Sequence, residues 1–202
     1  MNKSLILLTS LFLVHCSNPP PTSGPALDGN DPKQILETEP DWYRNQKDED
    51  GYTVGKGEGT SPSKAGARKI AVDNLMADLG QKTKTISEVR TESFFGQTGG
   101  DYDSSVRQKF DQIQSSISNA VLENYEEDQT ATFAEKSVNS EGRSLTIYRT
   151  YVTGKINRFT ADQRLLDQIK MEEELLTAVK ATEAYDKLQK DLEKYREKFN
   201  MK

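Results

Sequence analysis

The chain has 202 residues, enough for one domain with attachments rather than for two full domains. Hydrophobic residues make up 34% of it and charged residues 29%, so part of the chain should lie outside any packed core. The net charge is −5 and the lysines and arginines are interleaved with acids, which argues against a nucleic-acid partner because phosphate binding needs clustered cations.

The first residues have the pattern of an export signal. Lys3 gives a small positive start, and residues 5–14 are mostly apolar. The stretch is too short to cross a bilayer as a helix, which takes roughly 20 apolar residues. We therefore predict a signal peptide over residues 1–15.

This stretch ends in "LVHC" at residues 13–16, which resembles the lipobox of bacterial lipoproteins. His15 departs from the small residue that is usual before the cleavage site. We predict acylation, such as palmitate attachment, at Cys16. Ser17, rather than Asp, follows the cysteine, and under the sorting rule of bacteria with two membranes this favours the outer membrane. The alternative is an ordinary secretory signal with an incidental cysteine.

His15 and Cys16 are the only histidine and the only cysteine. A chain processed at Cys16 therefore keeps no histidine and no free thiol, which removes Ser-His-Asp and Cys-His catalysis, His/Cys metal sites and internal disulfides. We expect no enzyme activity, no metal and no cofactor. An enzyme that uses carboxylates alone is the remaining catalytic alternative.

Residues 16–40 are predicted to form the acylated cysteine and a tether. Residues 17–40 hold six of the seven prolines and few apolar residues, a composition typical of an extended, disordered linker. Such a segment suits a lipid anchor that holds a folded domain away from a membrane.

A folded domain is expected over residues 41–158. "YTVGKGEGT", residues 52–60, reads as a strand, and Ser61-Pro62 reads as the start of a helix. The helix has apolar residues at helical spacing: Ala65, Ala67, Ala71, Val72, Leu75, Met76 and Leu79. The strand has three alternate glycines, Gly55, Gly57 and Gly59, on one face.

These glycines raise the question of a phosphate site. A P-loop fails because Gly57 follows Lys56, and the dinucleotide fingerprint fails because Thr60 stands where its last glycine is needed. A strand face without side chains instead allows close approach of the alanine-rich helix. We predict that the glycines serve packing.

Further elements are predicted along the chain. Residues 82–95 are rich in threonine and β-branched residues and read as a strand. A second helix follows from the spacing of Val106, Phe110, Ile113, Ile117 and Val121. Residues 128–138 and 143–158 read as a β-hairpin. The predicted fold class is α+β, a small antiparallel sheet packed by helices in the order β-α-β-α-β-β.

Residues 159–202 are predicted to form one long charged C-terminal helix. Its apolar residues approximate a 3/4 repeat with a break around residues 182–185; they are Leu165, Ile169, Leu176, Val179, Leu188, Leu192, Tyr195 and Phe199. Such a seam indicates either docking on the domain or a short coiled coil, and hence a route to self-association or to contact with envelope proteins.

The loop around residues 94–102 is the one candidate ligand surface. Aromatic residues flank flexible glycines there, so Phe95 and Tyr102 are candidate ligand-binding residues. The alternative is that the two phenylalanines at its start, Phe94 and Phe95, belong to the core.

The order of these features resembles the Lpp-twenty-like family of bacterial lipoproteins, which includes a flagellar disk protein. The match covers roughly residues 40–160. It rests on Pro40, Trp42, Tyr43, Tyr52, Gly55, Gly57, Ala67, Ala71, Asn74, Leu75 and Ala77, and on residues 151–156. The tether and the C-terminal helix are not explained by it.

The resemblance implies a compact α/β domain without known catalytic residues, in a membrane-anchored envelope protein that works by self-association or scaffolding. Together with the anchor pattern, this leads to the prediction of a non-enzymatic outer-membrane lipoprotein with a structural or protein-interaction role. The alternative is a module that binds a small ligand or an envelope polymer through the loop around residues 94–102.

Overall fold

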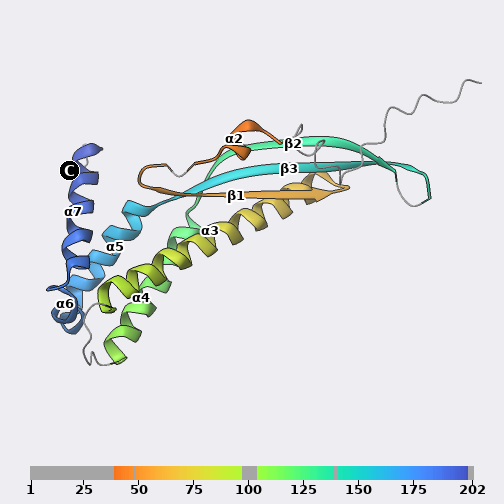
Figure 1. Cartoon of the computed structure of the whole chain (residues 1–202). Coiled ribbons are helices and arrows are strands. Elements are labelled where there is room, and N and C mark those ends of the chain that lie inside the picture. Colours follow the sequence, from red (N-terminus) through yellow and green to blue (C-terminus); the bar gives the residue numbers. More distant parts are fainter. Residues whose placement is uncertain (1–38, 48, 97–103, 139–140, 200–202) are drawn as a thin grey trace, which may run out of the picture.

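A three-stranded antiparallel sheet organises the chain, with helices on both of its faces and beyond one end (Figure 1). The computed structural model describes residues 39–47, 49–96, 104–138 and 141–199. The strands are β1 (Tyr52–Ser61), β2 (Glu126–Val138) and β3 (Ser144–Asn157). The helices are α2 (Asp41–Arg44), α3 (Lys64–Phe95), α4 (Ser104–Glu123), α5 (Arg158–Met171), α6 (Glu173–Val179) and α7 (Glu183–Lys198).

The spatial order of the strands is β1–β3–β2, so β3 is central and the other two strands are edges. The long helix α3 runs along one face of the sheet and the short helix α2 lies on the other (Figure 1). This arrangement confirms the predicted fold class, a small antiparallel sheet packed by helices with a helical C-terminal part.

Strand β1 and helix α3 lie in close contact, as predicted from the glycines of β1. A Cβ atom at Gly57 would overlap the carbonyl oxygen of Ala71, and one at Gly59 would overlap the carbonyl oxygen of Ala67. Ala67 and Ala71 are completely buried. The packing prediction for the glycines is therefore confirmed, because the helix backbone occupies the space that a side chain would need.

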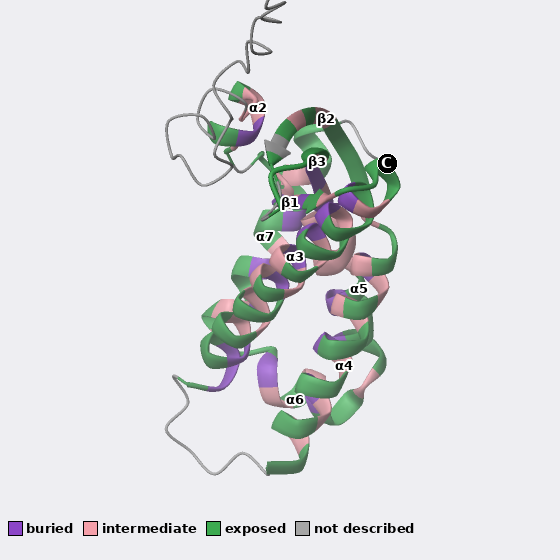
Figure 2. Cartoon of the chain, turned by 90° about the vertical axis from the view of Figure 1, so that its right-hand side faces the viewer, coloured by how far each residue is buried: buried purple, intermediate pink, exposed green. Residues whose placement is uncertain are grey.

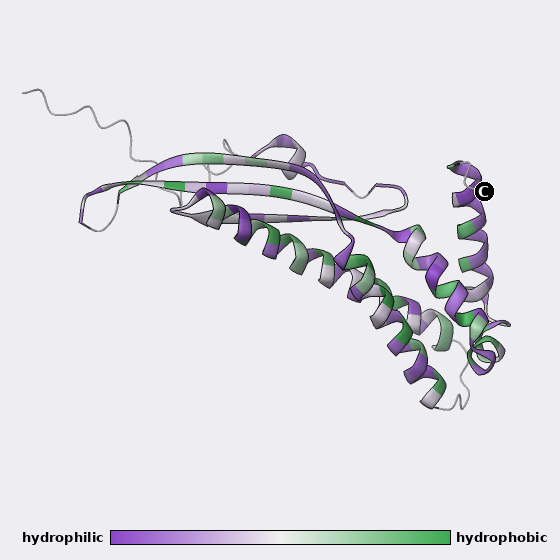
Figure 3. Ribbon diagram, turned by 180° about the vertical axis from the view of Figure 1, so that it is seen from behind, coloured by the Kyte–Doolittle hydropathy of each residue, from purple (hydrophilic) through white to green (hydrophobic). Residues whose placement is uncertain are grey.

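The start of α3 lies two residues later than the predicted Ser61-Pro62. Strand β1 continues through Ser61, and Ser63 is the N-cap, whose hydroxyl oxygen accepts a hydrogen bond from the amide of Gly66. Apolar bands recur along α3 beneath the sheet (Figure 3).

The predicted strand over residues 82–95 is wrong, because α3 continues unbroken to Phe95. Its hydroxyl groups bond back to the preceding turn of the helix: Thr83 Oγ1 donates to Leu79 O (2.8 Å) and Thr85 Oγ1 donates to Gln81 O (3.0 Å). Packing against α4 favours the helix over the β propensity of these residues. After α2 the element order is consequently β-α-α-β-β, followed by the C-terminal helices.

The predicted second helix and the hairpin are confirmed as α4 and as β2 with β3. Strand β3 pairs with β1 as far as Tyr148, opposite Ser61, but pairs with β2 as far as Ser144. The hairpin therefore extends beyond the end of β1 as a two-stranded ribbon, which Figure 1 shows at the right.

The C-terminal part consists of three helices rather than the one continuous helix that was predicted. It breaks at Glu172, between α5 and α6, and again before α7, where Thr182 Oγ1 accepts a hydrogen bond from Tyr185 N (3.2 Å). The predicted break around residues 182–185 thus corresponds to a capped helix start.

The buried residues form two clusters, and Figure 2 shows them where the elements meet. The first lies between α3 and the sheet and includes Leu75, Leu79 and Val152. The second lies among the helices and joins Phe110 of α4 to Ile169 of α5. Because α5, α6 and α7 contribute to the second cluster, they share a core with α3 and α4.

Helix α2 covers part of the other sheet face through Tyr43, which is buried. The ring centroid of Tyr43 lies 4.9 Å from that of Tyr151 in β3. Burial, with a further contribution from Glu58, raises the pKa of Tyr43 to about 12. Tyr43 therefore packs as a neutral, buried side chain.

Candidate interaction surface

Several sequence-predicted features lie outside the described residues. They are Cys16, most of the tether over residues 16–40, and Tyr102. Lipid attachment at Cys16 and a ligand contact at Tyr102 therefore stay predictions.

Phe95, the other candidate ligand-binding residue, lies in the helical core. Its side chain is 8% exposed, and its ring meets that of Phe110 edge-to-face at a centroid distance of 5.2 Å. Phe94 is also buried and its ring lies 5.0 Å from Phe110. The core alternative for the two phenylalanines is thus the one that the packing supports.

Two carboxylates converge in the structure, although the sequence did not indicate it. Arg149 of β3 forms ion pairs with Glu58 of β1 and with Glu135 of β2, the latter through Nε at 2.7 Å. The hydrogen bond to Glu135 is the largest cause of a raised pKa of Arg149. Since both carboxylates are paired with one guanidinium, the group joins the three strands and offers no free acid–base pair.

The described part of the chain holds no group of three Asp, Glu, His or Cys side chains placed to bind a metal ion. Among its surface features, the two edges of the sheet differ in how far their outward backbone groups are covered.

Side chains of α3 occupy the outer edge of β1. The side chains at positions 74, 78 and 82, one helical turn apart, bond to its outward backbone groups. The bonds run from Asn74 Nδ2 to Glu58 O (2.7 Å), from Lys56 N to Asp78 Oδ2 (3.0 Å) and from Lys82 Nζ to Val54 O (2.8 Å). This edge is thereby protected from pairing with another strand.

The same bonds reveal which groups of the other edge strand point outward. The outward groups of β1 belong to even-numbered residues, so its odd-numbered residues, such as Gly55, bond to β3. Gly55 lies opposite Gly154, so the odd-numbered residues of β3 face β2. Tyr151, an odd-numbered residue of β3, lies opposite Ala131, so the backbone groups of Ala131 face β3. The backbone groups of Thr130 and of the even-numbered residues after it therefore point outward, away from β3.

The outer edge of β2 has no such cover within the described residues. None of these residues hydrogen-bonds to the outward backbone groups of Thr130, Thr132, Ala134 or Lys136. None of the described side chains of β2 is buried. A register shift between Glu127 and Gln129 interrupts the start of the strand, so the regular edge begins at Gln129.

The ribbon beyond β1 adds apolar surface near this edge. Val138 is 52% exposed at the end of β2, and Leu145 is 39% exposed near the start of β3. A long edge strand with open backbone groups and exposed apolar neighbours is a template for pairing with another chain. The regular edge of β2, residues 129–138, is our candidate interaction surface.

The apolar seam of the C-terminal helices is used inside the chain. Leu165, Ile169, Leu188 and Leu192 belong to the helical core cluster. At the end of α7, Tyr195 stacks on Phe159 of α5 with ring centroids 4.6 Å apart. The seam thus docks on the domain, which was one of its two sequence interpretations, and the outer side of α7 is polar.

The sequence did not identify the β2 edge as a site. Residues 128–138 were predicted to be one arm of a hairpin, but a hairpin pattern does not show which arm receives a third strand. The one sequence feature that bears on the strand edges is the glycine face of residues 55–59, which predicted that a helix packs against β1.

Comparisons with family models, with curated proteins and with solved structures found no match to this chain. The resemblance to the Lpp-twenty-like lipoproteins therefore stays a hypothesis. Among the helices of the described residues, none has the length and apolar character needed to cross a membrane.

Proposed function

We propose that this protein is a non-enzymatic lipoprotein of the bacterial outer membrane that presents a scaffold domain near the bilayer. The observation that carries the proposal is the sequence around Cys16, where an apolar stretch ends in a lipobox-like "LVHC" and a proline-rich polar segment follows. Two or more acyl chains on Cys16 would anchor the chain, since a single chain gives only marginal binding.

Replacing Cys16 by alanine tests the anchor. Without the thiol no acyl chain can be attached, so we expect loss of palmitate labelling and a shift of the full chain from the membrane fraction to the soluble fraction. Ser17→Ala is the matched control and should keep both the label and the membrane partition. Membrane association and labelling that persist in Cys16→Ala would exclude lipid attachment at this residue.

For the scaffolding role we propose that two copies pair through the candidate interaction surface on β2. Antiparallel pairing of an edge strand with itself needs no second kind of surface, because a twofold axis relates the same residues of the two copies. Copies anchored in one membrane would also meet at a high effective concentration. The covered edge of β1 supports β2 as the edge that pairs.

Ala134→Pro tests this pairing. Ala134 is exposed and its amide points away from β3, so proline removes a donor that the isolated fold does not use. We expect dimers or larger assemblies of the full chain to become monomers in light scattering, with the circular dichroism spectrum unchanged.

Ala134→Thr is the control, because threonine keeps the amide and favours a strand. It should assemble like the original chain. An original chain that is monomeric at all concentrations, or an Ala134→Pro variant that assembles normally, would exclude pairing through β2 and would leave the lipid anchor untouched.

A further inference from the structure

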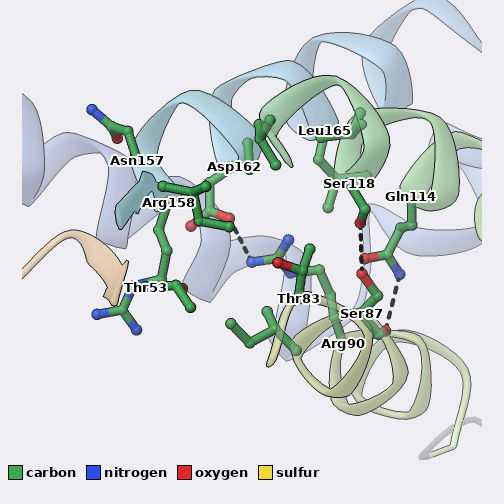
Figure 4. A pocket seen from close by; sticks show the side chains of 15 residues that line it. Thr53, Thr83, Ser87, Arg90, Gln114, Ser118, Asn157, Arg158, Asp162 and Leu165 are labelled. Carbon is green, nitrogen blue, oxygen red and sulfur yellow. Dashed lines mark hydrogen bonds and ion pairs between the residues drawn. The ribbon is translucent and has the colours of Figure 1, made fainter. Parts of the chain in front are cut away.

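A small pocket lies where the sheet meets the helices. Its walls come from α3, α4 and α5 and from the ends of β1 and β3, and its volume is about 30 Å³. Figure 4 shows polar side chains around it that belong to different elements, among them Thr53 of β1, Thr83 and Arg90 of α3, and Asp162 of α5.

The volume of the cavity limits what it can hold. A cavity needs about 10–15 Å³ to hold a water molecule, and small-molecule sites measure roughly 300–1,000 Å³. The space therefore has room for an ordered water and is too small for a metabolite or cofactor. An apolar cavity of this size would stay dry, so its polarity decides the matter.

Thr53 supplies a polar group that lacks a partner. The residue is 4% exposed, and its hydroxyl oxygen is buried without a hydrogen bond to the described protein atoms. Buried hydroxyls almost always have a protein or water partner, because burying a hydroxyl without a hydrogen bond is unfavourable. Thr53 lines the cavity, so a water held in the cavity is a candidate partner for the Thr53 hydroxyl.

Two other groups that line the cavity, the Thr83 hydroxyl and the Asp162 carboxylate, can accept further hydrogen bonds. Thr83 Oγ1 donates to Leu79 O at 2.8 Å and keeps its own lone pairs. The carboxylate of Asp162 is paired with Arg90 and still has acceptor positions. Burial raises the pKa of Asp162 although Arg90 opposes the shift, in keeping with a secluded polar site.

We propose that this cavity is a binding site for one ordered water molecule, which hydrogen-bonds to the Thr53 hydroxyl and to polar groups of α3 and α5. The water links the first strand of the sheet to the helices that carry the C-terminal part of the chain. It is a structural component of the fold and independent of the proposed membrane anchor.

Thr53→Val tests the proposal, because valine has nearly the same shape without the hydroxyl. A crystal structure of the full chain that resolves ordered waters should show one water within hydrogen-bonding distance of Thr53 Oγ1. Magnetic relaxation dispersion should count one long-lived water fewer in Thr53→Val, and Thr53→Ser should keep the original number.

Thr150→Val is the matched control. Thr150 is completely buried and its hydroxyl already bonds to that of Thr132 at 2.9 Å, and the residue does not line this cavity. Its variant should keep the original count. A dry cavity in the original chain, or a water that remains in Thr53→Val, would overturn the proposal.

Discussion

Replacing Gly57 by valine is expected to abolish folding or to lower the free energy of unfolding by about 3 kcal/mol or more, at the upper end of typical overpacking effects. The first added carbon would overlap the carbonyl oxygen of Ala71 and the amide nitrogen of Leu75. Both are backbone atoms of α3, so no side-chain rotation relieves the contact and the helix must move away from β1. Thermal unfolding followed by circular dichroism measures the effect.

Gly80→Ala is the control for Gly57→Val, because it adds a side chain to a glycine of α3 where there is room for it. A Cβ at Gly80 would meet only Leu122 Cδ1, at 4.0 Å, so alanine fits without a clash. Because glycine in a helix carries an entropic disadvantage, this variant should be more stable by about 0.4–1 kcal/mol. A Gly57→Val variant as stable as the original chain would contradict the close packing and would reopen a ligand role for the glycines.

Phe95→Ala is expected to lower the free energy of unfolding by about 3–5 kcal/mol, the usual range for removing a buried aromatic ring. The ring packs on Phe110, which is completely buried, and its loss leaves a cavity among α3, α4 and the C-terminal helices. Urea unfolding of the full chain gives the change. The loss arises from packing, so it should appear without any added ligand.

Val89→Ala is the matched comparison for Phe95→Ala. Val89 lies on the same helix and is 62% exposed, so its change should stay within about 0.5 kcal/mol. A Phe95→Ala variant of unchanged stability would contradict the core position. It would instead favour the alternative in which the loop around residues 94–102 contacts a ligand.

The part of the fold that local patterns describe well was predictable. Alternation along β1 and the alanine spacing of α3 were enough to predict their close contact. The hairpin followed from alternation in residues 143–158, and α4 followed from its helical spacing. In α3 and α4 one face of the helix is buried, so the pattern in the sequence matches the pattern of burial. Strand β3, which is central, is instead buried on both faces from Arg149 to Gly154.

The C-terminal half of α3 was not predictable in the same way. Threonine and β-branched residues favour strands when they stand alone. Here Thr83 bonds back to its own helix, and Thr91 Oγ1 donates to Asp111 of α4 at 2.8 Å. Contacts with an element that comes later in the chain therefore decided the secondary structure.

The candidate interaction surface could not be predicted from the sequence, for a related reason. An edge strand differs from a central strand only in what lies beside it, and that depends on the order β1–β3–β2. The joint pairing of Arg149 with Glu58 and Glu135 depends on the same order, because the two glutamates lie on the strands that flank β3.

The sequence by itself determined the likeness to an export signal at Cys16, the proline-rich tether, the loss of histidine and thiol chemistry on processing, and the glycine face of β1. These depend on residue type and short spacing. Only the tertiary structure decided that α3 is one helix, that the C-terminal seam docks inside the chain, and that β2 has the open edge. The physical reason is that each of these depends on which surfaces meet, and a helix or strand pattern defines a face without naming its neighbour.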